Sequence, residues 1–129
     1  MKLTARDERW PIAGAFTIAR GSKTEAHVVV VELEDQGARG RGEAVPYARY
    51  DETVETTLAE IEALRHRLET GIDRAALQDA IGPGAARNAL DCAAWDLAAK
   101  QARRSAAALA GEAPPQPCTT AFTISAKSK

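Results

Sequence analysis

The sequence contains few of the residues on which disulfide-bonded, metal-binding and membrane proteins depend. Of its 129 residues, only two are cysteine and two are histidine. Cys92 and Cys118 lie far apart and form no CxxC or Cys/His spacing, so we expect neither a disulfide framework nor a structural zinc site. No run of about 18 apolar residues occurs, which argues against a membrane span, and the N-terminus lacks the apolar segment of a secretory signal. We therefore expect a cytoplasmic protein with no membrane partner.

An excess of charge of one sign is also missing. Lysine and arginine total 17 against 18 aspartate and glutamate residues, which gives a formal net charge of −1. A protein that binds nucleic acid usually shows a strong positive excess or a basic face, so no nucleic-acid partner is expected. The chain does have a hydrophobic content of 45%, which is enough for a core in the single domain that its length suggests.

The first 45 residues have the composition of β-structure. Alternating apolar and polar side chains over residues 2–6 predict a weak strand that ends at Trp10-Pro11. A second extended segment begins at Phe16, is interrupted by RGSKTE at 20–25, and resumes at 26–33. This last part contains four consecutive valines, whose branched side chains favour strands.

A third strand follows a short turn. The polar residues at 34–37 end in a glycine and predict a hairpin. Arg39–Ala44 is expected to return as a strand, in which Gly40 and Gly42 alternate along one face. Because glycine leaves no side chain on that face, another element should pack closely against it. The segments and their short connections predict a three-stranded antiparallel meander.

From about residue 51 to 110 the pattern changes to helix. Asp51 is expected to cap the first helix, with Glu52 at its positive end. One apolar stripe runs along this helix and consists of Val54, Leu58, Ile61, Leu64 and Leu68. Asp73 is expected to cap a short second helix, and a long alanine-rich helix is predicted at roughly Ala85–Arg104. The chain is thus expected to be α+β, with a helical bundle after the meander.

The long helix carries polar residues that could suggest chemistry, but each has a structural interpretation. Cys92 is interpreted as a small packed residue in mid-helix. Asp91 and Asp96 point in different directions on a helix and would not bind one metal ion, and Asp96 is expected to form an exposed pair with Lys100. The two histidines have no serine or cysteine partner at an informative spacing. We therefore expect no catalytic residue and no metal ligand in this chain.

The C-terminal residues do not continue the helical pattern. APPQPC at 113–118 is a proline-rich linker, and TTAFTIS at 119–125 predicts one more strand. A lone strand after a linker has no visible partner. This arrangement indicates the first strand of a second domain whose remainder the chain does not contain.

Two loops remain as candidate binding elements. RGSKTE at 20–25 and VPYARY at 45–50 both combine cationic groups with hydroxyl-bearing side chains, which suits recognition of a carboxylate beside an apolar wall. GSKT at 21–24 also resembles the end of a phosphate-binding loop. That motif has different glycine spacing and opens into a helix, whereas a valine-rich strand follows here, so a phosphate-binding loop is not expected.

The alternative to a binding role is that both loops are ordinary solvated turns.

Several segments resemble the N-terminal capping domain of the enolase superfamily, in its muconate-lactonizing subgroup. They are VVVVELED with its hairpin, GRGEAVPYARY, AARNALDCAAWDLAAK and TTAFTIS, and the match runs through essentially the whole chain. ARGSKTE together with PYARY is similar to the dipeptide epimerases that act on L-Ala-D/L-Glu. The resemblance implies a capping domain at residues 1–112. It also implies a linker and the first strand of a (β/α) barrel at 113–129, with the rest of the barrel absent.

The same resemblance implies an activity that needs the missing barrel. In this family the cap closes over the mouth of the barrel, where the active site lies. The barrel supplies a pair of lysines as acid and base and three acidic ligands for Mg²⁺, so Mg²⁺ would not be bound by this chain. The expected reaction is a 1,1-proton transfer at the α-carbon of an acidic dipeptide, in a homo-oligomeric isomerase of peptidoglycan recycling. The chain alone is expected to be inactive.

Both loops are implied to contact the substrate. The residues concerned are Arg20, Ser22, Lys23, Tyr47, Arg49 and Tyr50. Arg20 is expected to pair with a substrate carboxylate, with Lys23 second because its ammonium is a point charge rather than a bidentate fork. Two alternatives stay open: the cap of an o-succinylbenzoate synthase or muconate cycloisomerase, and a stand-alone α+β module that binds a partner protein through its strand edge and helical face.

Overall fold

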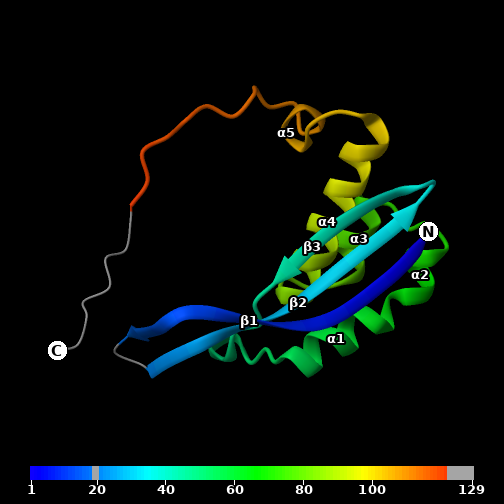
Figure 1. The fold of residues 1–129 in the computed structure, drawn as a ribbon. Coiled ribbons are helices and arrows are strands. Elements are labelled where there is room, and N and C mark those ends of the chain that lie inside the picture. The colour runs from blue at the N-terminus through cyan, green and yellow to red at the C-terminus, as the bar shows by residue number, and fades with distance from the viewer. Residues whose placement is uncertain (19–20, 122–129) are drawn as a thin grey trace.

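The computed structural model describes residues 1–18 and 21–121 as a sheet with helices on one face (Figure 1). Three antiparallel strands form the sheet in the order β1-β2-β3. They are β1 (Lys2–Ile18), β2 (Gly21–Asp35) and β3 (Ala38–Ala44). The predicted meander and the α+β class are confirmed, since the helices follow the strands along the chain.

The first strand is longer than its sequence pattern predicted. β1 continues through Pro11, which pairs with Glu25, and the register shifts between Pro11 and Phe16. β1 is an edge strand, and proline is tolerated at an edge because its missing N–H removes no bond from a central ladder. The expected end of the strand at Trp10-Pro11 is therefore wrong.

Beyond the end of β3, the first two strands continue as a two-stranded extension that we call the hairpin arm (residues 11–18 and 21–26). The ladder between β2 and β3 ends at the pair Val29 and Ala44, so the arm is held only by pairing between β1 and β2. Figure 1 shows the arm extending past β3. The predicted interruption at 20–25 is replaced by strand from Gly21 onward, while Arg20 lies outside the described residues.

The helical segments follow in the predicted order. Their bounds are η1 (Ala48–Tyr50, a 3₁₀ turn), α1 (Val54–Ala63), α2 (Arg65–Glu69), α3 (Arg74–Ala80), α4 (Ala85–Ala102) and α5 (Ala106–Leu109). The first predicted helix is divided into α1 and α2 at Leu64. Its stripe still faces the core, since Ile61, Leu64 and Leu68 are buried. The predicted short second helix and long third helix correspond to α3 and α4.

The helix caps match the sequence expectation in one case out of two. Asp73 caps α3, and its side chain accepts a hydrogen bond from the Ala76 amide at 2.7 Å. Asp51 does not cap α1. Thr53 does, in a capping box with Thr56, while Asp51 ends the preceding 3₁₀ turn with a left-handed φ of 58°. A hydroxyl two residues closer to the helix therefore takes the capping role.

The backbones of β3 and α4 pack closely against each other. A Cβ atom added to Gly40 would lie 2.1 Å from the carbonyl oxygen of Ala93, and one added to Gly42 would lie 2.0 Å from that of Ala89. The expected close approach to the two glycines is thus confirmed. Around this contact lies the core, whose buried members include Leu3, Val29, Val31, Leu33, Ile61, Leu68, Leu77, Ala86 and Leu90.

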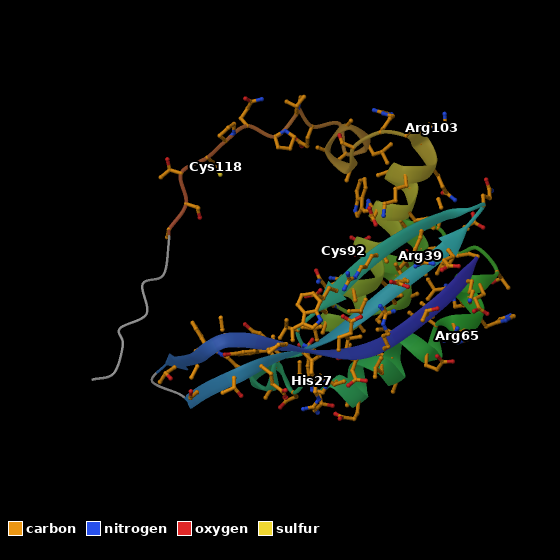
Figure 2. All side chains as sticks on the ribbon, viewed as in Figure 1. His27, Arg39, Arg65, Cys92, Arg103 and Cys118 are labelled. Carbon is orange, nitrogen blue, oxygen red and sulfur yellow. The ribbon has the colours of Figure 1, made fainter. Side chains whose placement is uncertain are left out.

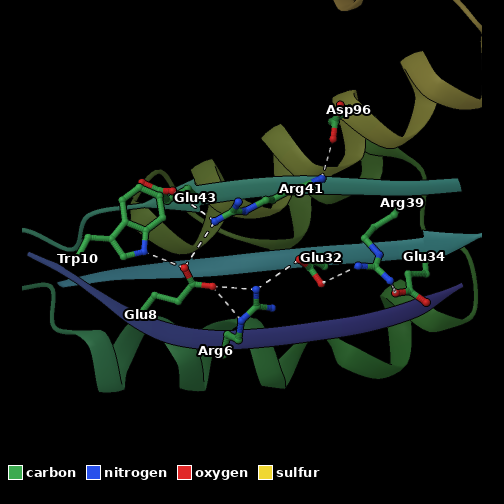
Figure 3. Close-up of polar contacts among 9 residues, drawn as sticks. All are labelled: Arg6, Glu8, Trp10, Glu32, Glu34, Arg39, Arg41, Glu43 and Asp96. Carbon is green, nitrogen blue, oxygen red and sulfur yellow. Dashed lines mark hydrogen bonds and ion pairs between the residues drawn. The ribbon is translucent and has the colours of Figure 1, made fainter. Parts of the chain in front are cut away.

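The other face of the sheet carries a lattice of charged side chains (Figure 3). Arg6 contacts Glu8 at 2.8 Å and Glu32 at 3.4 Å. The indole of Trp10 donates to Glu8 at 2.8 Å, and Arg41 lies 3.6 Å from the same carboxylate. Val28 and Val30 are almost fully buried but do not belong to the core cluster, and strand alternation places them on this face. The lattice therefore shields two valines as well as satisfying its own charges.

Of two polar residues of α4 that were interpreted from the sequence, one differs from its interpretation and one agrees with it. Cys92 is exposed rather than packed (Figure 2), because the buried stripe of α4 passes through its neighbour Ala93 instead. The expected pair of Asp96 and Lys100 is present at 2.6 Å. Asp96 also accepts from the backbone amide of Arg41 at 2.8 Å, so this pair joins α4 to β3.

After α5 the described chain is exposed and irregular. Residues 112–121 form neither helix nor strand. Of the predicted strand at 119–125, the first three residues are therefore irregular, and the remainder lies outside the described residues. Within the described ranges, the structure contains no barrel, and no helix there has the length and apolarity to cross a bilayer. The proposed domain boundary near residue 112 stays a prediction.

Candidate functional site

A hollow of about 620 Å³ lies between the hairpin arm and the segment that joins β3 to α1, which we call the 45–53 loop. Its lining residues are Phe16, Gly21, Ser22, Lys23, Pro46, Tyr47, Ala48, Arg49, Glu52 and Thr53. Two stretches that are far apart in the sequence thus form one cavity. Four residues predicted to contact a substrate, namely Ser22, Lys23, Tyr47 and Arg49, line it. Their binding role remains a prediction.

The local fold of the 45–53 loop brings its tyrosines together. The Tyr50 amide donates to the Tyr47 carbonyl at 2.8 Å, and the Asp51 amide donates to the Ala48 carbonyl at 3.2 Å, which forms the 3₁₀ turn. The left-handed conformation of Asp51 then turns the chain toward α1. As a result, the two tyrosine rings lie 6.1 Å apart between centroids.

The hollow combines positive charge with exposed aromatic surface. The ammonium of Lys23 lies 5.9 Å from the centroid of the Tyr47 ring, within the range of a cation–π contact. Tyr47 is 41% exposed and Phe16 is 44% exposed. Within the part of the chain that the structure describes, neither Lys23 nor Arg49 is joined to a carboxylate. Such a surface can accept an anionic group beside an apolar one.

The remaining predicted site residues are not all in this hollow. Tyr50 is 70% exposed and lines a neighbouring hollow of about 290 Å³, which also includes Tyr47, Glu52 and Gly84. Arg20 lies outside the described residues. Ser22 is in the hollow, and its hydroxyl is 3.0 Å from the hydroxyl of Thr17.

Glu52 is a residue of the site that sequence reasoning assigned to the wrong helix. It was expected at the positive end of α1. Instead, its carboxylate accepts from the amide of Ala85, the first residue of α4, at 2.7 Å. It also accepts from the amide of Tyr47 at 3.1 Å. The signal that could have indicated this role is the Gly-Pro-Gly sequence before α4, because its capping position, Gly84, has no side chain.

Titratable groups at the base of the arm are engaged in structural pairs. The ring Nε2 of His27 lies 2.8 Å from Asp7, and this hydrogen bond lowers the pKa of the Asp7 carboxyl below its ordinary value. Arg9, which lies just before the arm, contacts Glu25 at 2.6 Å. Among the residues that the structure describes, no group of three or more His, Cys, Asp or Glu side chains could hold a metal ion. A Mg²⁺ site therefore does not fit the described residues.

The arrangement of a sheet, a close-packed helix and two loops at one end corresponds to a known domain. Residues 1–111 match the family model of the mandelate racemase / muconate lactonizing enzyme N-terminal domain. The chain belongs to this family. Its resemblance to the capping domains of the enolase superfamily is thereby confirmed, and so is the corresponding fold class.

The family relatives include dipeptide epimerases. The chain is 49% identical over 118 residues to the L-Ala-D/L-Glu epimerase of Escherichia coli strain K12, a match that covers 92% of this chain and 37% of that enzyme. The chain thus spans little more than a third of this curated relative.

Two solved structures of enolase-superfamily proteins show the same fold with bound ligands. One, from Agrobacterium tumefaciens, has homology to dipeptide epimerases and contains sodium and L-Ala-L-Glu. It superposes with a TM-score of 0.90 at 48% identity, over 97% of this chain and 38% of that one. The other is the dipeptide epimerase of Enterococcus faecalis with Mg and L-Leu-L-Tyr, with a TM-score of 0.68 at 28% identity, over 79% of this chain and 31% of that one.

Proposed function

We propose that this chain is the substrate-specificity cap of a dipeptide epimerase that acts on acidic dipeptides of the L-Ala-D/L-Glu type. The observation that carries the proposal is the hollow between the hairpin arm and the 45–53 loop, which presents Lys23 and Arg49 beside exposed aromatic rings. A cation that forms no ion pair with a protein carboxylate can bind the carboxylate of a ligand. The similarity to an L-Ala-D/L-Glu epimerase supports the same substrate class.

Each side chain of the hollow has a proposed task. Lys23 and Arg49 attract the side-chain carboxylate of the dipeptide, and Tyr47 with Phe16 forms the apolar wall along its backbone. Ser22 is proposed to donate a hydrogen bond to the dipeptide. Its hydroxyl also contacts the hydroxyl of Thr17. Arg20 is still proposed as the main partner of the carboxylate on the grounds of the resemblance, because a guanidinium binds a carboxylate with two parallel bonds.

The cap contributes binding and enclosure rather than bond breaking. On the grounds of the resemblance, Mg²⁺ and the acid–base groups are proposed to belong to a barrel domain, and no cluster of metal ligands occurs among the described residues. When bound there, the metal ion would stabilise the negative charge that develops as the α-proton leaves. The residues of the cap orient the acidic side chain and exclude water, which strengthens the electrostatic interactions of the closed site.

The proposal also covers the setting of the enzyme. We propose a cytoplasmic homo-oligomer that takes part in the recycling of peptidoglycan peptides, as the resemblance to dipeptide epimerases implies. This chain is 48% identical to the Agrobacterium tumefaciens protein whose structure contains L-Ala-L-Glu, and 28% identical to the Enterococcus faecalis enzyme whose structure contains L-Leu-L-Tyr. This difference favours acidic over apolar dipeptides as substrates.

The test begins with the mass of the native polypeptide that carries this sequence. We expect it to exceed the 13.7 kDa of this chain by a barrel of about 250 residues. The purified protein should then exchange deuterium at the α-carbon of the glutamyl residue of L-Ala-L-Glu in a Mg²⁺-dependent manner, and L-Leu-L-Tyr should react more slowly. Preference for L-Leu-L-Tyr would reject the acidic substrate, and a native mass of 13.7 kDa would favour a stand-alone binding module instead.

A further inference from the structure

One carboxylate that lines the hollow, that of Glu52, joins the 45–53 loop to the N-terminus of α4. Glu52 is half-buried. One of its oxygens accepts from the Ala85 amide at 2.7 Å, and the other accepts from the Tyr47 amide at 3.1 Å. Glu52 and Tyr47 are the two lining residues that the 620 Å³ hollow shares with its 290 Å³ neighbour.

On one side of Glu52 lies the first turn of α4, which is fixed by its packing in the core. Ala85, Ala86 and Ala89 are buried at the start of this helix, and its backbone lies directly against the glycines of β3. The capping position, Gly84, makes no side-chain cap hydrogen bond. A Cβ atom added to Gly84 would lie 2.9 Å from the carboxylate of Glu52. The glycine therefore leaves the space in which an external carboxylate caps the helix, where negative charge is favourable.

On the other side lies the start of the 3₁₀ turn. Tyr47 precedes this turn, and its carbonyl accepts the first hydrogen bond of the turn from Tyr50 at 2.8 Å. Its own amide is held by Glu52, while its ring lines the hollow beside Lys23. Tyr47 has an extended backbone with φ −123° and ψ 115°, so no strain of its own holds it there. Fixing its amide fixes the point from which the ring projects.

We propose that Glu52 is a positioning residue that sets the Tyr47 wall of the hollow by clamping the 45–53 loop to the N-terminus of α4. One carboxylate accepts two charge-assisted hydrogen bonds, which fix the position of the loop relative to the helix. Without them, the 3₁₀ turn would keep its internal bonds but lose its registration against the core. The effect of the Tyr47 position on substrate binding rests on the proposed function, whereas the contact of Glu52 with the two amides does not.

The clamp can be tested by amide hydrogen exchange in the native polypeptide that carries this chain. In Glu52→Ala, peptides covering the amides of Tyr47 and Ala85 should exchange roughly tenfold faster or more, as expected from the loss of a hydrogen bond to a charged group. Peptides from the centre of β2 should not change. Glu52→Gln should fall in between, because the two amides bind different oxygens of Glu52, and in glutamine one of these oxygens is replaced by an NH2 group that cannot accept. Glu60→Gln, which removes a carboxylate from an exposed position of α1, is the matched control.

Kinetics with L-Ala-L-Glu distinguish positioning from a merely structural role. We expect Glu52→Ala to raise KM by roughly tenfold with kcat changed far less, and Glu60→Gln to behave as wild type. Unchanged exchange at Tyr47 in Glu52→Ala would overturn the clamp. Faster exchange with unchanged kinetics would overturn the positioning role. If the wild-type polypeptide has no epimerase activity, the proposed function fails, while the exchange of the two amides still decides the clamp.

Discussion

The two ends of the sheet are held by different kinds of interaction. At the end where β3 and α4 meet, backbone packs on backbone, and Gly40 and Gly42 leave no room for even a methyl group. At the other end, the hairpin arm has neither a third strand nor buried side chains among residues 21–25 of β2. The arm depends on the pairing of its own two strands, and the 45–53 loop depends on a few polar contacts such as those of Glu52. The candidate site thus lies at the less tightly packed end of the sheet, where the amino-acid sequence can vary without disturbing the core.

The largest effect is expected at the close-packed end. Gly42→Ala should reduce the free energy of unfolding by about 3 kcal/mol or more, because the added methyl group meets backbone rather than a movable side chain. Urea unfolding followed by tryptophan fluorescence measures this change in the 129-residue chain. Gly82→Ala is the matched control, since a Cβ there has nothing within 4 Å. If both variants unfold at the same urea concentration, the close contact between β3 and α4 does not control stability.

The next largest effect is expected in the segment RGSKTE at 20–25, on activity rather than stability. Arg20→Ala in the complete enzyme should lower kcat/KM for L-Ala-L-Glu by about tenfold or more, the size expected for a lost charge-assisted contact. Lys23→Ala should lower it less. Steady-state kinetics also on L-Leu-L-Tyr would show whether the loss is specific to the acidic side chain.

The control for the Arg20→Ala and Lys23→Ala variants is Arg67→Ala. It removes an exposed cation from α2, away from the hollow. It should leave both substrates unaffected. Equal losses for Arg20→Ala and Lys23→Ala would contradict the assignment of Arg20 as the main carboxylate partner.

A smaller effect is expected where the loop joins α1. Thr53→Ala should reduce the free energy of unfolding by about 1 kcal/mol, the usual contribution of an N-cap hydroxyl, because Thr53 accepts from the Thr56 amide at 3.1 Å. Thr53→Ser keeps the hydroxyl and should be close to wild type. Urea unfolding of the three proteins gives the comparison, and equal stability of Thr53→Ala and Thr53→Ser would show that the cap is dispensable.

The smallest effect concerns pH and the base of the arm. The hydrogen bond from His27 lowers the pKa of Asp7 from its ordinary value of 3.8. A carboxyl with a lowered pKa in the folded state stabilises the fold above its unfolded pKa, and this contribution disappears as the pH falls through the folded value. The stability difference between wild type and Asp7→Asn should therefore be constant above about pH 5 and shrink below pH 4. A difference that does not change down to pH 2.5 would contradict this linkage.

The sequence predicted the elements better than it predicted their ends. Strand alternation, the hairpin turn and the alanine-rich helix gave the meander and α4 correctly. The errors fell where a local rule competed with the tertiary environment. Pro11 ends a central strand but not an edge strand, and Cys92 suits a packed position by composition but lies beside the buried stripe of α4.

The two loops of the candidate site were predicted to contact one substrate, and the structure places both of them around one hollow. Lys23 and Tyr47 come together in one hollow, although the binding roles of these residues stay predictions. Glu52 was missed because its position before α1 suggested a role in that helix. Its actual partner, Ala85, lies 33 positions later, and no local pattern specifies a contact over that distance.

The sequence by itself determined the order of elements, the family, and the two glycines that require close packing, since periodicity and the absence of a side chain act within a few residues. Only the tertiary structure decided that the hairpin arm faces the 45–53 loop, and that one glutamate caps a helix far along the chain. These contacts depend on the angle at which α4 crosses the sheet and on the length of each strand beyond β3. Both are set by the packing of the whole core.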